Sequence, residues 1–375
     1  MGQFPKVLAI GFLLGLLAPA FALSPAAAQD RPKIGVILPL SGNAAYEGEL
    51  MRRGLELAVG ELQASVPVEL IFEDSQGDTK MAVTAFRALR AQHQVSKIIS
   101  WGSGIGLALL PLANQEQVLQ LGVATSSPKF TVVGDLGFRI HPTAASEAAF
   151  TVDRIKNFFK ASRVALVTVN NDYGNGLAEN FKAAAANAGI ATVFHETFEP
   201  AETDFRTLMV KLKSAAPDLV YLVSYAGPTT QILRRARELG IKTPFLTSIA
   251  AVGSANFVKD IGSAGEGLNV IVPGPAYAAT SQPEELHFRD IYEAKYHETV
   301  GPAQSLVCRS FDALMLFARA AKDCGWTDQK CFSQALLQTQ NYRGASGKLS
   351  FDQAGDSILD FSLQSLRNGS FVAVG

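Results

Sequence analysis

Hydroxyl and aromatic side chains follow apolar runs at separate places in the chain. Tyr173 lies in the polar turn 171–174, directly after a run of branched and small apolar residues. Ser103 and the pair Thr125 and Ser126 follow two other such runs. Small ligands of open α/β sheets bind at the carboxyl ends of the strands. These side chains therefore predict two ligand-facing sheet edges, and two edges on separate sheets indicate a two-lobed clamp.

The sequence does not contain the usual motifs of catalysis, metal binding or nucleotide binding. The five His are not spaced as metal ligands. Ser103 lacks the glycine two residues before it that a nucleophile elbow requires. Leu349 stands where a phosphate loop needs Ser or Thr, and Leu107 breaks the glycine pattern of a dinucleotide site. We therefore expect a binding protein with no cofactor and no metal, and an enzyme is a distant alternative.

Apolar runs of strand length alternate with helix-length segments along the chain. Strands are expected at 34–40, 68–72, 97–100 and 122–125, and after Pro142 at 163–169, 192–194, 219–223, 245–247 and 268–272. Such alternation is typical of parallel sheets covered by helices on both faces, so we expect an α/β fold built on such sheets. The formal net charge of −1 gives no sign of nucleic acid as a partner.

The first 28 residues have the pattern of a signal peptide. Lys6 precedes an apolar run from Val7 to Leu23, and three alanines end at Ala28. The alternative is a membrane anchor, but the run is shorter than the ~18–20 residues that span a bilayer. No cysteine stands at the end of this segment, which argues against a lipid anchor. We expect cleavage near Ala28 and a mature chain free in the periplasm.

Six residues separate Cys324 from Cys331 in the C-terminal third of the chain, and an exported protein meets an oxidising compartment. A structural disulfide between them is expected, and two free thiols at a helix junction are the alternative. Cys308 lies among apolar residues at helical spacing and is expected to be an unpaired core residue.

Several segments resemble one protein family. They are 40–42 with Gly48 and Gly54, then 72–78, 123–128, 171–174 and 347–351. In these segments, which cover nearly all of the mature chain in order, the protein is similar to the periplasmic substrate-binding proteins of ABC transporters, in the leucine, isoleucine and valine branch. The resemblance implies a type I periplasmic binding fold of class α/β, in which three crossovers join two doubly wound parallel-sheet lobes and the ligand is closed between them. The implied boundaries are 29–141 plus 273–352 for lobe 1 and 142–272 plus 353–375 for lobe 2.

The resemblance also implies roles for single positions. Ser103, Thr125 and Ser126 fall where the family holds the ligand carboxylate, and amides at a helix start suit an anion. Tyr46 matches an aromatic of the first lobe that covers the side-chain pocket, and Tyr173 and Tyr225 match aromatics of the second lobe. The alternatives are that the hydroxyls only cap helices and that the tyrosines only pack.

One departure from the family concerns the ligand's ammonium group. Family members that bind amino acids carry an acid after the strand 245–247, and here residues 248–253 contain none. A second family carboxylate aligns with Ala144. Glu147 or Asp172 is a possible replacement, although Asp172 is the better helix cap. Two ligands therefore stay open: a hydrophobic amino acid, or an amine-free aromatic or aliphatic acid.

The expected function is that of the solute-binding component of an ABC importer. The ligand is a small, largely apolar carboxylate or amino acid, and the partners are ABC permease subunits in the inner membrane. We expect a monomer that does not bind nucleic acid. A periplasmic sensor subunit is an alternative with the same fold, and an export signal argues against a DNA-binding regulator.

Overall fold

The computed structural model describes residues 1–6, 31–63 and 65–374. The chain divides into Met1–Arg31 and Pro32–Gly375, and the fold lies in the second of these units. The expected signal peptide falls almost wholly on residues 7–30, outside the described residues. None of the helices in the described ranges is long and apolar enough to cross a membrane.

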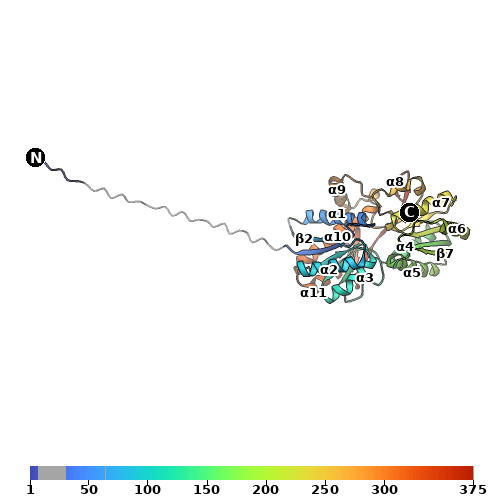
Figure 1. The fold of residues 1–375 in the computed structure, drawn as a ribbon, viewed down its shortest axis with the longest axis horizontal. Helices are drawn as coiled ribbons and strands as arrows, with labels where there is room; N and C mark the ends of the chain where they lie inside the picture. The colour runs from blue at the N-terminus through green and yellow to red at the C-terminus, as the bar shows by residue number, and fades with distance from the viewer. Residues whose placement is uncertain (7–30, 64, 375) are drawn as a thin grey trace. The chain divides into compact units, whose positions relative to one another are not determined.

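The first lobe is built on a five-stranded parallel sheet of order β2-β1-β3-β4-β5. Its strands are β1 (Lys33–Leu38), β2 (Glu69–Asp74), β3 (Lys97–Ser100), β4 (Leu119–Gly122) and β5 (Gly137–Arg139). Its helices are α1 (Ala45–Leu62), α2 (Thr79–His93), α3 (Ser103–Gln115), α9 (Pro283–Tyr296), α10 (Ser305–Cys324) and α11 (Gln329–Leu337). The helices α1 and α10 pack on one face of this sheet and α2 and α3 on the other. Figure 1 shows α1 above the sheet and α2 and α3 below it.

Alternation along β1 explains why this lobe has two cores. Val36 and Leu38 belong to the core formed with α1 and α10, whereas Ile37 belongs to the core formed with α2 and α3. Successive side chains of a strand point to opposite faces, so an all-apolar strand fits a sheet covered on both faces. On the upper face α1 and α10 approach so closely that a Cβ on Gly54 would lie 2.2 Å from the carbonyl oxygen of Val307.

The second lobe is built on a seven-stranded sheet of order β15-β14-β10-β9-β8-β6-β7. Its strands are β6 (Arg163–Val169), β7 (Ala191–Phe198), β8 (Leu219–Val223), β9 (Phe245–Thr247), β10 (Asn269–Pro273), β14 (Phe361–Arg367) and β15 (Ser370–Ala373). Its helices are α4 (Ala144–Asn157), α5 (Asp172–Asn187), α6 (Arg206–Ala215), α7 (Ala226–Glu238) and α8 (Phe257–Ile261). The strands β6 to β10 are parallel, and β14 and β15 pair antiparallel at one edge.

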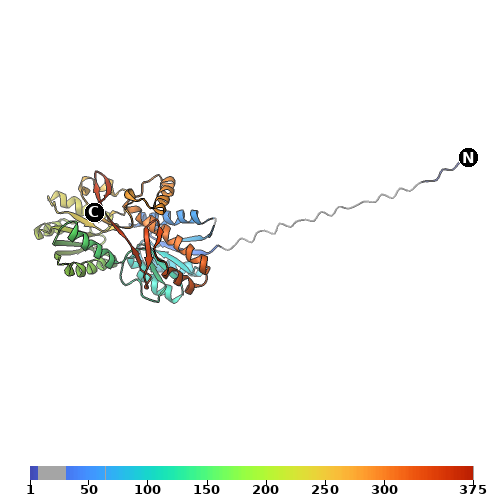
Figure 2. The same cartoon turned by 180° about the vertical axis from the view of Figure 1, so that it is seen from behind.

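The chain passes between the two sheets three times, after β5, after β10 and before β14. The last passage follows a small antiparallel sheet of β11 (Tyr342–Gly344), β12 (Gly347–Phe351) and β13 (Ser357–Leu359). Because β13 pairs with β12, we propose that lobe 1 extends to Leu359 rather than ending at 352, and that Asp360 carries the third connection. Figure 2 shows the red C-terminal strands running from one lobe to the other.

The fourth strand of the first sheet differs from the prediction. Residues 122–125 were expected to form it, but β4 spans Leu119–Gly122 and the next residues form a loop. The polar Gln120 conceals the strand in the sequence. Its side chain is fully buried, and its amide donates to Ser100 Oγ at 3.0 Å and to the Gly106 carbonyl at 3.3 Å. A buried amide with such partners is compatible with a core strand.

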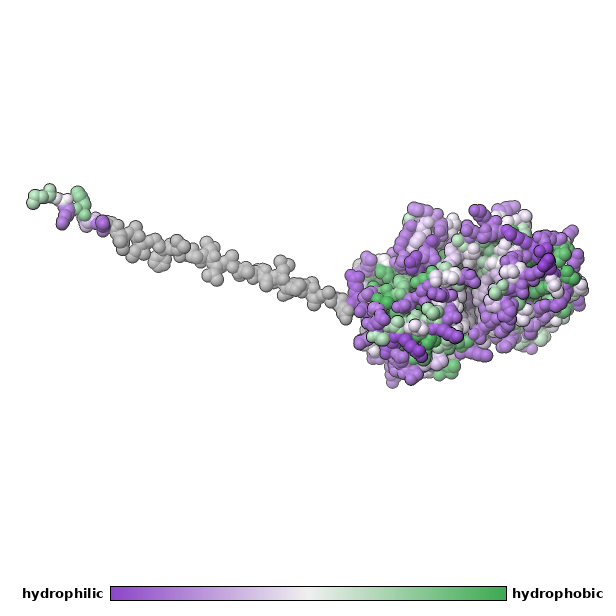
Figure 3. Space-filling model, in the orientation of Figure 1, coloured by the Kyte–Doolittle hydropathy of each residue, from purple (hydrophilic) through white to green (hydrophobic). Residues whose placement is uncertain are grey.

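Cys324 and Cys331 are joined by a disulfide with Cα atoms 5.5 Å apart, between the end of α10 and the start of α11. Cys308 is buried in α10 with a free thiol. Within the described ranges, no group of three or more His, Cys, Asp or Glu side chains could hold a metal ion. In the view of Figure 3, the surface of both lobes is largely hydrophilic.

Candidate ligand-binding cleft

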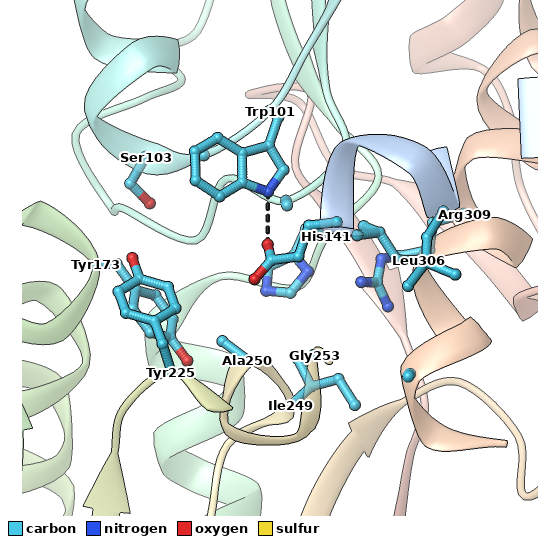
Figure 4. Close-up of a pocket in the computed structure, with 15 residues that line it drawn as sticks. Trp101, Ser103, His141, Tyr173, Tyr225, Ile249, Ala250, Gly253, Leu306 and Arg309 are labelled. Atoms are coloured by element: carbon cyan, nitrogen blue, oxygen red, sulfur yellow. Dashed lines mark hydrogen bonds between the residues drawn. The ribbon is translucent and has the colours of Figure 1, made fainter. Parts of the chain in front are cut away.

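A cleft between the lobes is lined by side chains from both sheets. The first lobe contributes the starts of α1 and α3 and part of α10, and the second lobe contributes Tyr173, Tyr225, Ile249, Ala250 and Gly253. It holds about 580 Å³ of space not filled by protein atoms, part of it open to solvent. Figure 4 shows these side chains converging from separate elements.

Ser103 lines the cleft at the first turn of α3. Gly102 before it has a φ of 81°, a left-handed conformation that suits glycine. Ser103 Oγ accepts hydrogen bonds from the backbone N–H groups of Ser126 and Ser127, both at 3.2 Å. Its own O–H is therefore free to donate toward the cleft, next to the unpaired amides of the helix start.

Thr125 and Ser126 support this turn from behind. Thr125 Oγ1 donates to the Gly102 carbonyl at 3.2 Å, and both residues are buried. Neither residue lines the cleft, so the structure brings them next to Ser103 without exposing them to the cleft. The Ser126 Oγ atom is buried without a hydrogen-bond partner among the described residues.

Two tyrosines form the wall on the second lobe. Tyr173 is in the first turn of α5 and Tyr225 precedes α7, and their ring centroids are 5.8 Å apart. The Tyr173 hydroxyl is hydrogen-bonded to Ser248 Oγ at 2.5 Å, and Asn171 Nδ2 donates to the Tyr225 hydroxyl at 3.1 Å. Burial raises the pKa of Tyr225 to about 12 and the pKa of Tyr173 further above its usual range. Both rings are neutral and held in place.

The glycine after Tyr173 is required by this geometry. A Cβ on Gly174 would lie 1.9 Å from the carbonyl oxygen of Val169, the last residue of β6. Asn171 caps the helix, since its Oδ1 accepts from the Gly174 N–H at 3.0 Å. The turn 171–174 therefore brings α5 directly onto the end of the strand, which holds Tyr173 at the cleft.

Tyr46 does not line the cleft. It packs against the core of the first lobe, and the charges nearest to its hydroxyl are those of Glu298 and Arg53. The residue of α1 that reaches the cleft is its neighbour, Glu47. Consecutive residues of a helix point in different directions, so Glu47 faces the cleft while Tyr46 packs against the core.

Glu47 is the acid of the cleft, and the sequence reasoning missed it. Trp101 Nε1 donates to Glu47 Oε2 at 2.7 Å, the bond drawn as a dashed line in Figure 4. Its other oxygen faces the second lobe, where a Cβ on Gly253 would lie 3.2 Å from it. Burial raises the pKa of Glu47 to about 7, against the opposing effects of Trp101 and Arg309. The signal in the sequence was an acid in the first turn of the first helix.

Arg309 and His141 also line the cleft and were not predicted. Arg309 is 1% exposed, and burial lowers its pKa to about 10, so it remains a cation at neutral pH. His141 is buried, and burial, followed by the charges of Arg309 and Arg139, lowers its pKa well below 6.5, so its ring is neutral. Apolar neighbours in the sequence of α10 conceal Arg309, because only the tertiary fold turns it toward the cleft.

The two acids proposed as replacements lie elsewhere. Glu147, in the first turn of α4, accepts from the Tyr221 hydroxyl at 3.2 Å and does not line the cleft. Asp172 is exposed at the start of α5. The turn after β9 presents Ile249, Ala250 and Gly253, with no acid. The carboxyl group of the cleft therefore comes from the first lobe.

The fold and the cleft define a two-lobed α/β binding protein, and the comparisons give its family. The family model for periplasmic binding proteins matches residues 32–362, so the chain belongs to the periplasmic binding protein family. The predicted resemblance to periplasmic substrate-binding proteins and the predicted type I periplasmic binding fold are confirmed.

Individual relatives agree with this family. The chain is 25% identical over 337 residues to Leu/Ile/Val-binding protein homolog 3 of Brucella melitensis biotype 1, covering 86% of this chain and 88% of the relative. It is similar to the crystal structure of the leucine binding protein LivK of Thermotoga maritima, with a TM-score of 0.86, 26% identity and 92% and 98% of the two chains covered. An ABC transporter solute binding protein from R. palustris, solved with benzoate, shares the fold with a TM-score of 0.82, 19% identity and 92% and 96% coverage.

Proposed function

We propose that the protein is the periplasmic solute-binding component of an ABC importer, which captures a small, largely apolar carboxylate and delivers it to a membrane permease. The observation that carries the proposal is the cleft itself, where the start of α3 faces a wall of two neutral tyrosines on the other lobe. Hydrogen-bond donors for an anion on one side and an aromatic surface on the other suit an acid with an apolar body.

In this proposal Ser103 and the amides at the start of α3 hold the ligand carboxylate. Thr125 and Ser126 position Ser103, and Tyr173 and Tyr225 cover the apolar part of the ligand. The second lobe contacts the ligand only when the lobes close, so the ligand shifts the protein toward the closed form by its differential affinity. A shift from 1:99 to 99:1 needs about 5.5 kcal/mol of such affinity.

The chemistry of the second end of the ligand has two candidates, each supported by a residue of the cleft. Glu47 offers a counter-charge for the ammonium group of an amino acid, in line with the names of the Leu/Ile/Val-binding relatives. Arg309 places a cation in the same cleft, which disfavours a ligand amine beside it and so favours an amine-free acid, in line with the benzoate named for the R. palustris neighbour. The class common to both is a small carboxylate.

The location and partners follow from the family. We propose that residues 1–28 are removed near Ala28, that the mature chain works in the periplasm as a monomer, and that its closed form docks on ABC permease subunits. Binding without turnover is the proposed activity, with no cofactor. A periplasmic sensor that presents ligand to a membrane receptor remains the alternative, and ligand-dependent copurification with a permease separates the two.

A thermal-shift screen tests the proposed binding. The mature protein is unfolded and refolded to remove bound ligand and then melted with leucine, isoleucine, valine and phenylalanine, their keto acids, benzoates, and the diacids hexanedioate and benzene-1,4-dicarboxylate. A ligand at 100 times its dissociation constant stabilises the folded state by about 2.7 kcal/mol, which moves the melting curve clearly. A shift with any of these acids supports the function, and the absence of a shift across the whole panel contradicts it.

A further inference from the structure

The guanidinium group of Arg309 has no anionic partner. Its Nε and Nη1 donate only to the carbonyl oxygens of Val123 and Pro273, both at the long distance of 3.4 Å. No carboxylate of the described residues lies within ion-pair distance of it. Arginine offers five N–H donors in a planar fork, so most of its capacity is unused.

The other fully buried arginine of the first lobe shows how this chain pairs a structural guanidinium. Arg139 bonds to Asp356 at 2.5 Å, to Thr131 Oγ1 at 2.7 Å and to the carbonyl of Ser127 at 2.7 Å. Buried charges are normally paired because an unpaired charge loses its hydration without compensation. Arg309 departs from this pattern, and it lies in the cleft, whereas Arg139 does not.

The two acids whose charges act on Arg309 do not neutralise it. Glu47 is hydrogen-bonded to Trp101, and Glu147 accepts from Tyr221. Burial raises the pKa of each carboxyl to about 7, so both are only partly ionised at neutral pH. His141 adds an observation of its own, since its Nδ1 is buried at the cleft without a hydrogen-bond partner among the described residues.

Arg309 and Ser103 mark opposite ends of the cleft. In Figure 4 Ser103 lies on the side of Tyr173 and Tyr225, and Arg309 lies on the far side, beyond His141. The apolar side chains of Leu50 and Leu306 also line the cleft. The lining therefore offers hydrogen-bond donors for an anion at both ends of the cleft, with apolar surface between them.

We propose that Arg309 and His141 form a second carboxylate-binding subsite, and that the ligand is a small diacid whose second carboxylate binds there while the first binds at Ser103. This inference rests on the proposed function and specifies its substrate class. The guanidinium fork matches a carboxylate in bidentate geometry. A ligand ammonium at this end would instead meet the unpaired guanidinium, which disfavours a simple amino acid.

Matched pairs of acids test the subsite. Calorimetric titration compares hexanedioate with hexanoate, and benzene-1,4-dicarboxylate with benzoate, on the wild-type protein and on Arg309→Gln. For at least one pair the wild type binds the diacid about tenfold or more tightly than the monoacid, and Arg309→Gln removes this preference while leaving the monoacid affinity within about threefold. Arg309→Lys, which keeps the charge without the fork, retains part of it.

Arg53→Gln is the matched control. Arg53 is a partly buried arginine of α1 that pairs with Glu49 and Glu298 and does not line the cleft. Arg53→Gln therefore changes the net charge by the same amount as Arg309→Gln without changing the cleft. The Arg53→Gln protein prefers the diacid over the monoacid to the same extent as the wild type. If Arg309→Gln does not fold, the diacid and monoacid affinities of the wild-type protein alone decide whether the subsite exists.

Two results overturn the subsite, and they differ in what else they remove. If monoacids or leucine bind the wild type as tightly as the diacids, the subsite is wrong and the binding function stands. If none of these acids binds the wild type, the proposed function fails and the subsite fails with it.

Discussion

The carboxyl group of Glu47 makes the stability of the ligand-free protein depend on pH. Burial in the cleft raises its pKa to about 7 from the ordinary 4.5. A carboxyl with a raised pKa stabilises the fold while it is protonated, and this contribution is lost as the pH rises through the folded-state pKa. A tenfold change in the proton affinity of a group corresponds to about 1.36 kcal/mol, so the full effect is about 3 kcal/mol, reduced to about 2–3 kcal/mol by the partial solvent access of the cleft.

Replacing Glu47 by glutamine removes this dependence. Glutamine keeps an acceptor for Trp101 Nε1 and carries no charge, so at about pH 8 Glu47→Gln is more stable than the wild type by about 2–3 kcal/mol. Below about pH 4, where the carboxyl is protonated in the folded and the unfolded protein, the two proteins are equally stable. Urea denaturation of ligand-free protein between these pH values measures the difference.

Glu147 provides the matched control for this prediction. Burial also raises its pKa to about 7, but it bonds to Tyr221 and does not line the cleft. Glu147→Gln therefore produces a similar gain at high pH and leaves ligand affinity unchanged, whereas Glu47→Gln changes both. A Glu47→Gln protein whose stability follows the wild-type pH curve would refute the assignment of a buried, titrating carboxyl to the cleft.

Three further predictions concern binding and stability. A diacid bound near Glu47 raises the pKa of that carboxyl further, so diacid binding is tighter at about pH 6 than at about pH 8 by roughly threefold or more, as measured by calorimetry. Tighter binding at the higher pH would instead indicate a ligand amine. Tyr173→Phe leaves the buried Ser248 hydroxyl without its partner and lowers the free energy of unfolding by about 1–3 kcal/mol; an unchanged urea midpoint contradicts this. Replacing Cys324 and Cys331 by serine lowers the free energy of unfolding by about 2–3 kcal/mol, as expected for so short a loop, and leaves ligand affinity unchanged because the disulfide is remote from the cleft lining; a loss of affinity would show that the disulfide shapes the site.

Local patterns in the sequence were sufficient for most strands and for part of the cleft, whereas the crossovers and the lobe boundaries were implied by the family resemblance. The all-apolar runs of β1 and β6 indicate strands buried on both faces, and the structure places them inside the two sheets. Ser103, Tyr173 and Tyr225 line the cleft because each follows the carboxyl end of a parallel strand, a position that sequence periodicity can locate.

The charged residues of the cleft could not be predicted in the same way. Glu47 and Arg309 are on helices whose other residues pack in the core, and the direction of one side chain on a helix depends on how that helix crosses its neighbours. Neither residue is in a local motif. The resemblance to amino-acid-binding relatives pointed to the second lobe for an acid, whereas the fold supplies it from α1 of the first lobe.

The central claim is that a small acid binds in the cleft between the two lobes, and a crystal structure of the protein with the best acid from the thermal-shift screen tests it most directly. The account predicts ligand density between the lobes, with one carboxylate at Ser103 and the start of α3 and the apolar part against Tyr173 and Tyr225. Density at another surface, or an empty cleft at saturating ligand, would contradict it.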